Sequence, residues 1–334
     1  MTQIAPPVPL ATKLSLELEQ PIDPLDLGGE TEQLELAPLS IRIANLVAIT
    51  LPFAGLLVAV AMLWGVAYNW VYLAMFLGGY VLTGLGITVG FHRYFTHKSF
   101  EAPRAVQAAL GILGSMALEG PLLTWAATHR LHHQHSDRMD DPHSPHTHGE
   151  GFSGFFKGLI HSHFGWLFMK EPENLAKYAP DLAKDPLVQF ISRTFLLWTL
   201  IGLVLPAVVG GLVTGTWMGV LLGFLWGGLA RIFLVHHVTW SVNSVCHLWG
   251  SRPFRSHDHS RNNALFGILA FGEGWHNNHH AFPASARHGL RPWQFDLSYL
   301  VIRVLGLVGL ARDIRVPTPD RLQAKLATQP SKAH

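Results

Sequence analysis

The feature that most constrains this chain is the absence of any Asp, Glu, Lys or Arg between Arg42 and Arg93. A second charge-free stretch covers residues 194–230. A transmembrane helix needs about 20 apolar residues, so each stretch is long enough for two crossings joined by a tight turn. We place the turns at "GVAYNW" and "GGLVTGTW", where Trp70 and Trp217 suit an interfacial aromatic belt. The sequence therefore predicts an all-α integral membrane protein with four transmembrane helices in two hairpins.

Composition supports a membrane protein and argues against other classes. Only 14% of the residues are charged, against about 25% in soluble globular chains. The alternative for the apolar stretches is a buried helix pair in a soluble protein, but helices of about 20 apolar residues without a polar face are rarely that. A formal net charge of +2 gives no basic field for nucleic acid. The single cysteine, Cys246, excludes an intramolecular disulfide.

The distribution of basic residues predicts the orientation. All 24 Lys and Arg residues lie outside the two turns, so by the positive-inside rule both termini and the long loops are cytoplasmic. Residues 1–42 lack the basic start and apolar core of a signal peptide, and we expect an acidic, disordered cytoplasmic tail. The remaining predicted parts are a membrane domain over residues 43–315 with spans at 43–66, 71–91, 194–212 and 216–236, a helical cytoplasmic cap at 92–193 and 237–315, and a short cytoplasmic tail at 316–334.

The chain has 21 histidines, and many of them are clustered on the predicted cytoplasmic side. In "HRLHH" and "HNNHH" the spacing i, i+3, i+4 places three imidazoles on one face of a helix. The i, i+5 spacing in "HRYFTH" does so only if the helix ends or distorts between the two histidines. With the histidine of "NSVCH", the clustered set is His92, His97, His129, His132, His133, His247, His276, His279 and His280.

The size of this set indicates two metal ions sharing one site, because a catalytic zinc needs about three protein ligands and a structural zinc four. Neutral imidazole binds Fe, Cu, Zn and Ni alike, so spacing alone does not select the metal. The clusters contain no carboxylate, which excludes the soluble di-iron bundles built on Glu-x-x-His. We assign the remaining histidines to positions around the site, to loops or to the surface. The nearby Asp137, Asp140 and Asp141 either orient imidazole N–H groups or cap and hydrate a loop.

The linked motifs resemble those of the membrane fatty-acid desaturases of the acyl-CoA or Δ9 type, similar to stearoyl-CoA desaturase and to its bacterial or cyanobacterial branch. The resemblance covers about Arg42 to Arg315 and rests on the order and separation of five motifs. They are "GFHRYFTHKSF", "HRLHHQHSDRMDDPHSP", "GFFKGLIHSHFGWLF", "TWSVNSVCHLWGSRPF" and "GEGWHNNHHAFPASARHGL". It implies that the nine histidines bind two irons, that Asn243 contacts one iron through water, and that no catalytic residue acts beyond the ligands. It also suggests that Trp125 and Thr239 kink the substrate chain near the metals.

The resemblance further implies an O2-dependent reaction that places a cis double bond, at Δ9, in a saturated C16 or C18 acyl chain. The substrate is an acyl-CoA or a lipid-linked acyl group of the membrane. Some family members carry a fused cytochrome b5 module with an H-P-G-G motif, which the tail after Arg315 does not contain. We therefore expect electrons from a separate ferredoxin, rubredoxin or cytochrome b5 with its reductase.

Two other functions stay open on the sequence. A di-iron hydroxylase of fatty acyl or alkane substrates would use the same kind of centre and differ in its product. A metal transporter or membrane haem carrier would place its ligands within the spans, near the midplane or on facing helices. The predicted spans are nearly bare of ligands, which favours the enzyme.

Overall fold

The computed structural model describes residues 35–66, 69–172 and 174–327, and most of the predicted acidic tail lies outside them. From Glu35 onward the described residues belong to one compact unit. Their regular structure is entirely helical, with only isolated bridges between extended residues. The predicted all-α class is therefore confirmed.

Four helical segments are long and apolar enough to cross a membrane, as predicted. Each one has no charged residue through most of its length. These helices therefore have no polar face for water to solvate, as expected of a membrane span. They are α2 (Leu39–Val66), α3 (Trp70–Leu85) continued by η1 (Gly86–Thr96), α9 (Phe195–Thr214), and α10 (Trp217–Gly223) continued by η4 (Phe224–Ala230) and α11 (Arg231–Leu248).

Two of these helical segments continue past the predicted ends of the membrane spans. The second was expected to end at residue 91 and continues to Thr96, and the fourth was expected to end at residue 236 and continues to Leu248. The polar residues that suggested an exit into water are instead buried in the protein, as His92 and His247 are. Burial against other helices thus lets a helix continue past the first polar side chains.

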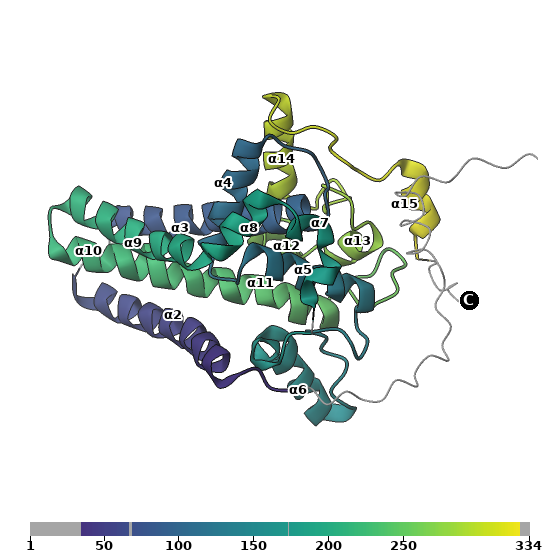
Figure 1. The fold of residues 1–334 in the computed structure, drawn as a ribbon, viewed down its shortest axis with the longest axis horizontal. Coiled ribbons are helices and arrows are strands. Elements are labelled where there is room, and N and C mark those ends of the chain that lie inside the picture. The colour runs from purple at the N-terminus through teal and green to yellow at the C-terminus, as the bar shows by residue number, and fades with distance from the viewer. Residues whose placement is uncertain (1–34, 67–68, 173, 328–334) are drawn as a thin grey trace, which may run out of the picture. The chain divides into compact units, whose positions relative to one another are not determined.

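Shorter helices gather at the end of the long helices where η1 and α11 stop, as Figure 1 shows for α5, α12 and α13. The shorter helices that follow the second span are α4 (Arg104–Ser115), α5 (Leu122–His135), α6 (Gly151–His163), η2 (Gly165–Phe168), η3 (Leu175–Tyr178), α7 (Pro180–Ala183) and α8 (Pro186–Arg193). Those that follow the fourth span are α12 (Ala264–Leu269), α13 (His276–Ala281), α14 (Leu297–Leu307) and α15 (Pro319–Lys325).

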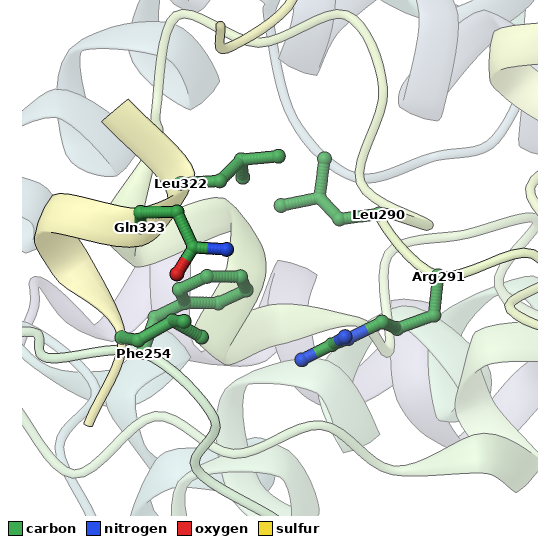
Figure 2. Close-up of a pocket in the computed structure, with 6 residues that line it drawn as sticks. Phe254, Leu290, Arg291, Leu322 and Gln323 are labelled. Atoms are coloured by element: carbon green, nitrogen blue, oxygen red, sulfur yellow. The ribbon is translucent and has the colours of Figure 1, made fainter. Parts of the chain in front are cut away.

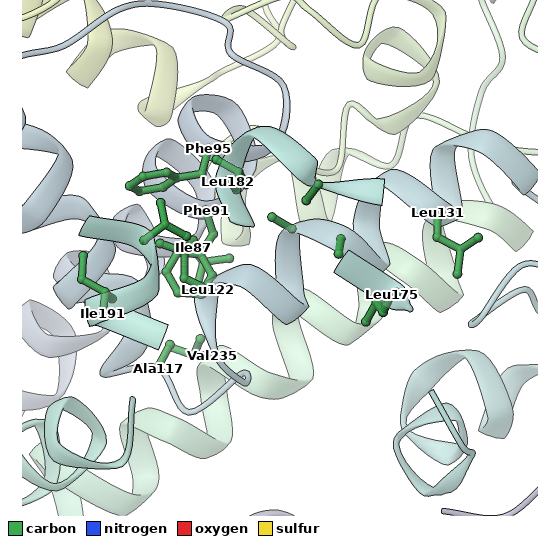
Figure 3. Close-up of a cluster of buried hydrophobic side chains, with 14 of the residues drawn as sticks. Ile87, Phe91, Phe95, Ala117, Leu122, Leu131, Leu175, Leu182, Ile191 and Val235 are labelled. Atoms are coloured by element: carbon green, nitrogen blue, oxygen red, sulfur yellow. The ribbon is translucent and has the colours of Figure 1, made fainter. Parts of the chain in front are cut away.

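A cluster of buried apolar side chains fixes the helices at this end of the molecule (Figure 3). Phe91 and Phe95 from η1 pack with Leu122 from α5, Ile191 from α8 and Val235 from α11. Phe91, Leu122 and Ile191 have no exposed surface. Because η1, α5 and α11 also carry clustered histidines, this core sets the positions from which the histidines project.

The chain breaks its helix between α4 and α5, over residues 116–121, and the fourth span supplies the missing hydrogen bonds. Arg231 is buried and donates through Nη1 to the carbonyl oxygen of Met116 at 2.9 Å. His236 Nε2 lies 3.0 Å from the carbonyl oxygens of both Ala117 and Leu118. Buried backbone carbonyl groups outside a helix need hydrogen-bond partners, and Arg231 and His236 supply them here.

The residues predicted as a short C-terminal tail include α15, which packs on the main unit. Its Leu322 and Gln323 close a small cavity over Phe254 and Leu290 (Figure 2). Lys325 Nζ donates to the carbonyl oxygen of Ala281, the last residue of α13, at 3.0 Å. The C-terminal segment therefore holds the helix that contains "HNNHH" from outside.

Candidate metal centre

The i, i+5 pair His92 and His97 is brought together by a helix distortion. Residues Gly86–Thr96 form a π-helix, and the backbone N–H of His97 donates to the carbonyl oxygen of His92 at 3.1 Å. The wider turn of a π-helix brings residues five apart onto one side. The two imidazole centroids lie 4.8 Å apart.

All nine predicted metal ligands assemble into two groups, in each of which the candidate ligand nitrogens lie within 4.8 Å of one another. Each HxxHH triplet is divided between the groups instead of converging on one point. Residues i and i+4 of α5 enter one group and residue i+3 enters the other. The five-histidine group consists of His92, His97, His129, His133 and His279, and the four-histidine group of His132, His247, His276 and His280.

Carboxylates hold several of these imidazoles in one orientation. Nδ1 of His132 lies 2.9 Å from Asp141, and Nδ1 of His247 lies 2.9 Å from Asp137. His280 makes the same contact with Asp258. A carboxylate on Nδ1 keeps the proton on that nitrogen, so the lone pair of Nε2 points to the opposite side of the ring, as in carboxylate–histidine–metal arrangements.

His92 in the five-histidine group has the same kind of partner, because its Nδ1 lies 2.6 Å from Glu273 Oε2. Glu273 is itself fixed by His288 Nδ1 at 3.1 Å and by Arg93 Nε at 3.2 Å. The carboxylate thus links a ligand of the π-helix to the segment just before α13.

The nitrogens opposite these carboxylates fit a bound cation. In the four-histidine group, Nε2 of His132 and Nε2 of His280 are buried and have no hydrogen-bond partner. Nε2 of His247 lies 3.0 Å from Nε2 of His276. Because His247 carries its proton on the Asp137 side, the two facing nitrogens include at least one lone pair directed into the group. A metal ion between the rings would satisfy this set of donors.

Four imidazoles of the two groups are in a protonation state that suits metal binding. Burial, reinforced by neighbouring histidines, holds the pKa of His129, His133, His276 and His279 well below the usual histidine value. These imidazoles are therefore neutral at pH 7 and have a free lone pair. Burial alone would raise the pKa of Asp141, but the electrostatic interaction and hydrogen bond with His132 outweigh it and lower that pKa.

The two asparagines of "HNNHH" position α13. Asn277 Oδ1 accepts from the backbone N–H of Phe254 at 2.9 Å. Asn278 Nδ2 donates to the carbonyl oxygen of His288 at 2.7 Å and to Gln294 Oε1 at 2.9 Å. Both asparagines are buried, so they connect the six-residue helix to the segments on either side of it.

The predicted acidic residues occupy different positions. Asp137 and Asp141 contact His247 and His132, whereas the side chain of Asp140 is 75% exposed and lies 3.6 Å from His135. Asn243 lies on α11 one helical turn before His247.

Sequence reasoning missed Glu273, Asp258 and the contact of His288 with Glu273. Glu273 stands inside the motif "GEGWHNNHH", so the sequence alone could have pointed to it. Asp258 is 22 residues before the histidine that it contacts, in a segment with no helical period, and no local signal marks it.

Trp125 and Thr239, expected to contact substrate, meet at a third side chain. The Trp125 indole stacks on the His129 ring at a centroid distance of 5.1 Å and an angle of 13°. Its Nε1 donates to Glu119 Oε2 at 3.1 Å, and Thr239 Oγ1 donates to Glu119 Oε1 at 2.5 Å. Burial raises the pKa of Glu119 to about 7. Glu119 is not among the residues to which the sequence pointed.

Comparison with known proteins gives consistent matches. Residues 68–297 match the model of the family described as "Fatty acid desaturase". The chain is 42% identical to a hex-5-enoyl-[acyl-carrier protein] acetylenase of Moorena producens, over 82% of this chain and 86% of the relative. It is 39% identical to an sn-1 stearoyl-lipid 9-desaturase of Anabaena variabilis, over 75% and 86%. It is 38% identical to Delta-9 acyl-lipid desaturase 1 of Arabidopsis thaliana, over 76% and 78%.

Proposed function

Because this chain belongs to the fatty acid desaturase family and is an oxidoreductase of fatty acyl chains, we propose that it introduces a cis double bond with two iron ions held by its nine clustered histidines. The observation that carries this proposal is the division of those histidines into groups of five and four, with candidate ligand nitrogens within 4.8 Å in each group. When bound, the two irons would supply the activation of O2 and the oxidant for an unactivated C–H bond.

The chain's own residues would hold and orient the ligands. His132, His247 and His280 each have a carboxylate on Nδ1, which fixes both the ring and its tautomer. Asn243, one turn before His247 on the same helix, is our candidate for a contact through water. We assign no catalytic residue beyond these ligands.

The wall next to the five-histidine group would position the acyl chain. Trp125 covers one face of His129, so a chain lying against the indole reaches the metal ligands without passing through bulk water. Glu119 holds both the indole and the Thr239 hydroxyl, which gives this wall a fixed shape. Positioning and exclusion of water are the protein's contributions to such chemistry.

We further propose Δ9 as the position and a saturated C16 or C18 chain linked to a membrane lipid as the substrate. Support comes from the names of two relatives, which are a stearoyl-lipid 9-desaturase and a Δ9 acyl-lipid desaturase. Electrons would come from a separate protein of the ferredoxin, rubredoxin or cytochrome b5 type.

The experiment is turnover of the purified protein in lipid vesicles with a chemical reductant under 18O2. Desaturation sends both oxygen atoms to water, so the acyl product gains a double bond and no 18O. Mass spectrometry with double-bond localisation then tests the Δ9 assignment. An acyl product that carries one 18O atom would contradict desaturation and identify the protein as a hydroxylase.

A further inference from the structure

An apolar groove lies between α2 and the third and fourth spans, away from the metal ligands. It has a volume of about 340 Å3 and is lined only by apolar residues. Ala44, Ala48 and Leu51 line it from α2, and Leu203, Leu229 and Ile232 line it from α9, η4 and α11. All of these elements are candidate membrane spans, so the groove faces the bilayer.

Two close contacts fix α2 on either side of the residues that line the groove. At Gly55 the helix approaches η4 so closely that an added Cβ atom would lie 2.5 Å from Leu229 Cδ1. Nearer its start, Asn45 Nδ2 donates to the carbonyl oxygen of Leu167 at 2.5 Å. Small residues in transmembrane helices usually allow another helix to pack closely. Ala44 and Ala48 instead line the groove.

The groove lining includes Leu118, the residue before Glu119 in the sequence. Leu118 lines the groove and has a left-handed backbone, with φ of 62°. The next residue, Glu119, holds Trp125 and Thr239, and Trp125 stacks on His129. Glu119, Trp125 and Thr239 each keep part of their surface exposed. The groove lining and the wall beside the five-histidine group are therefore joined by consecutive residues, Leu118 and Glu119.

We infer that this groove is a lateral entry site for the acyl chain of a membrane lipid, which passes Leu118 to reach the Trp125 wall. The inference rests on the proposed function and deepens it by naming the route by which a lipid-linked chain enters. A chain still attached to its lipid stays in the bilayer, so it must enter between spans. Arg42 lies two residues before Ala44 at the start of the span, where a cation suits the phosphate groups of the lipid surface.

The first test needs no turnover. The full-length protein, in phosphatidylcholine vesicles that contain phosphatidylcholine with a mid-chain diazirine, is irradiated and its labelled peptides are mapped. We expect labelling of the peptide that contains Leu118 and Trp125. Ala48→Trp, which fills the groove, should reduce that labelling by about tenfold or more. Val58→Trp is the matched control, because Val58 is 48% exposed on α2 and lies outside the groove.

The second test measures conversion of lipid-linked stearoyl chains by the same variants. Ala48→Trp should lower conversion about tenfold, with Val58→Trp within about twofold of wild type. Equal labelling and equal conversion in the two variants would contradict the groove as the entry site of the acyl chain. If Ala48→Trp does not accumulate as a folded protein, Ala44→Phe replaces it. Groove-dependent labelling without any acyl product from wild type would support the groove and contradict the proposed function.

Discussion

At the scale of single residues, the candidate centre includes carboxylates that contact its imidazoles at Nδ1, on the side away from the unpartnered Nε2 atoms. Asp258 is buried and contacts Nδ1 of His280, as Asp141 contacts His132. The sequence could point to the six histidines of the two HxxHH motifs because their spacing is helical, and to His92, His97 and His247 only through the motifs that surround them. It could not predict Asp258, because an aspartate in an irregular segment gives no sign of the ring that it will meet in the folded chain.

Asp258→Asn should weaken metal binding by about 10–100-fold, the usual cost of removing a carboxylate that orients a ligand. The neutral amide no longer holds His280 in the tautomer that leaves Nε2 free. Metal content after equilibration at graded free Fe2+ measures the change. Asp140→Asn is the control, since Asp140 is largely exposed. Equal loss of metal in both variants would show that Asp258 has no orienting role.

Glu119 should make the protein less stable as pH rises. Burial raises its folded pKa to about 7, above the value of about 4.3 in an unfolded chain. Its contribution to stability is therefore complete below about pH 4 and is lost progressively as pH rises through 7. The difference in Tm between wild type and Glu119→Gln, measured in detergent from pH 5 to 8, should shift in favour of the variant. If the Tm of wild type and of Glu119→Gln changed in parallel with pH, the raised pKa of Glu119 would be contradicted.

At the scale of elements, helix geometry explains why the HxxHH triplets divide. With 3.6 residues per turn, positions i+3 and i+4 lie about 100° apart around the axis, so His132 and His133 face different groups. The sequence predicted a shared face and missed this division, because the face is broad enough for two ions. It predicted that the helix must end or distort between His92 and His97, and the π-helix is that distortion.

The contact between η1 and α4 is tight enough to be tested with glycine. A Cβ atom at Gly86 would lie 2.2 Å from the backbone nitrogen of Gly114, whereas one at Gly78 meets nothing within 4 Å. Gly86→Ala should therefore destabilise the protein by about 3 kcal/mol or more, since overpacking against backbone cannot relax. Gly78→Ala should leave stability equal or slightly higher. Thermal unfolding in detergent compares the two variants. A Gly86→Ala protein as stable as wild type would contradict the close contact between Gly86 and Gly114.

At the scale of the whole molecule, the charge-free stretches were enough to predict four spans, because lipid requires long apolar helices. The helices of the second and fourth predicted spans continue past the predicted span ends, since buried histidines look like solvent-exposed ones in sequence. The position of α15 against Phe254 was not predictable either, because few apolar residues mark its packing.

We predict that both termini and the metal centre face the cytoplasm, because the turns of the two hairpins carry no Lys or Arg. A reporter that is active only outside the cytoplasm should be active when fused after residue 216 and inactive when fused after residue 327. A reporter active after residue 327 would reverse the orientation.

The most direct test of the central claim is the fatty-acid profile of a host that expresses wild type, His276→Ala or His148→Ala. His276 belongs to the four-histidine group, whereas His148 lies outside both groups. Gas chromatography–mass spectrometry with double-bond localisation should find new Δ9 monoenes with wild type and with His148→Ala, and none with His276→Ala. Monoenes that persist in His276→Ala, with the protein present in equal amount, would contradict a desaturase built on this centre.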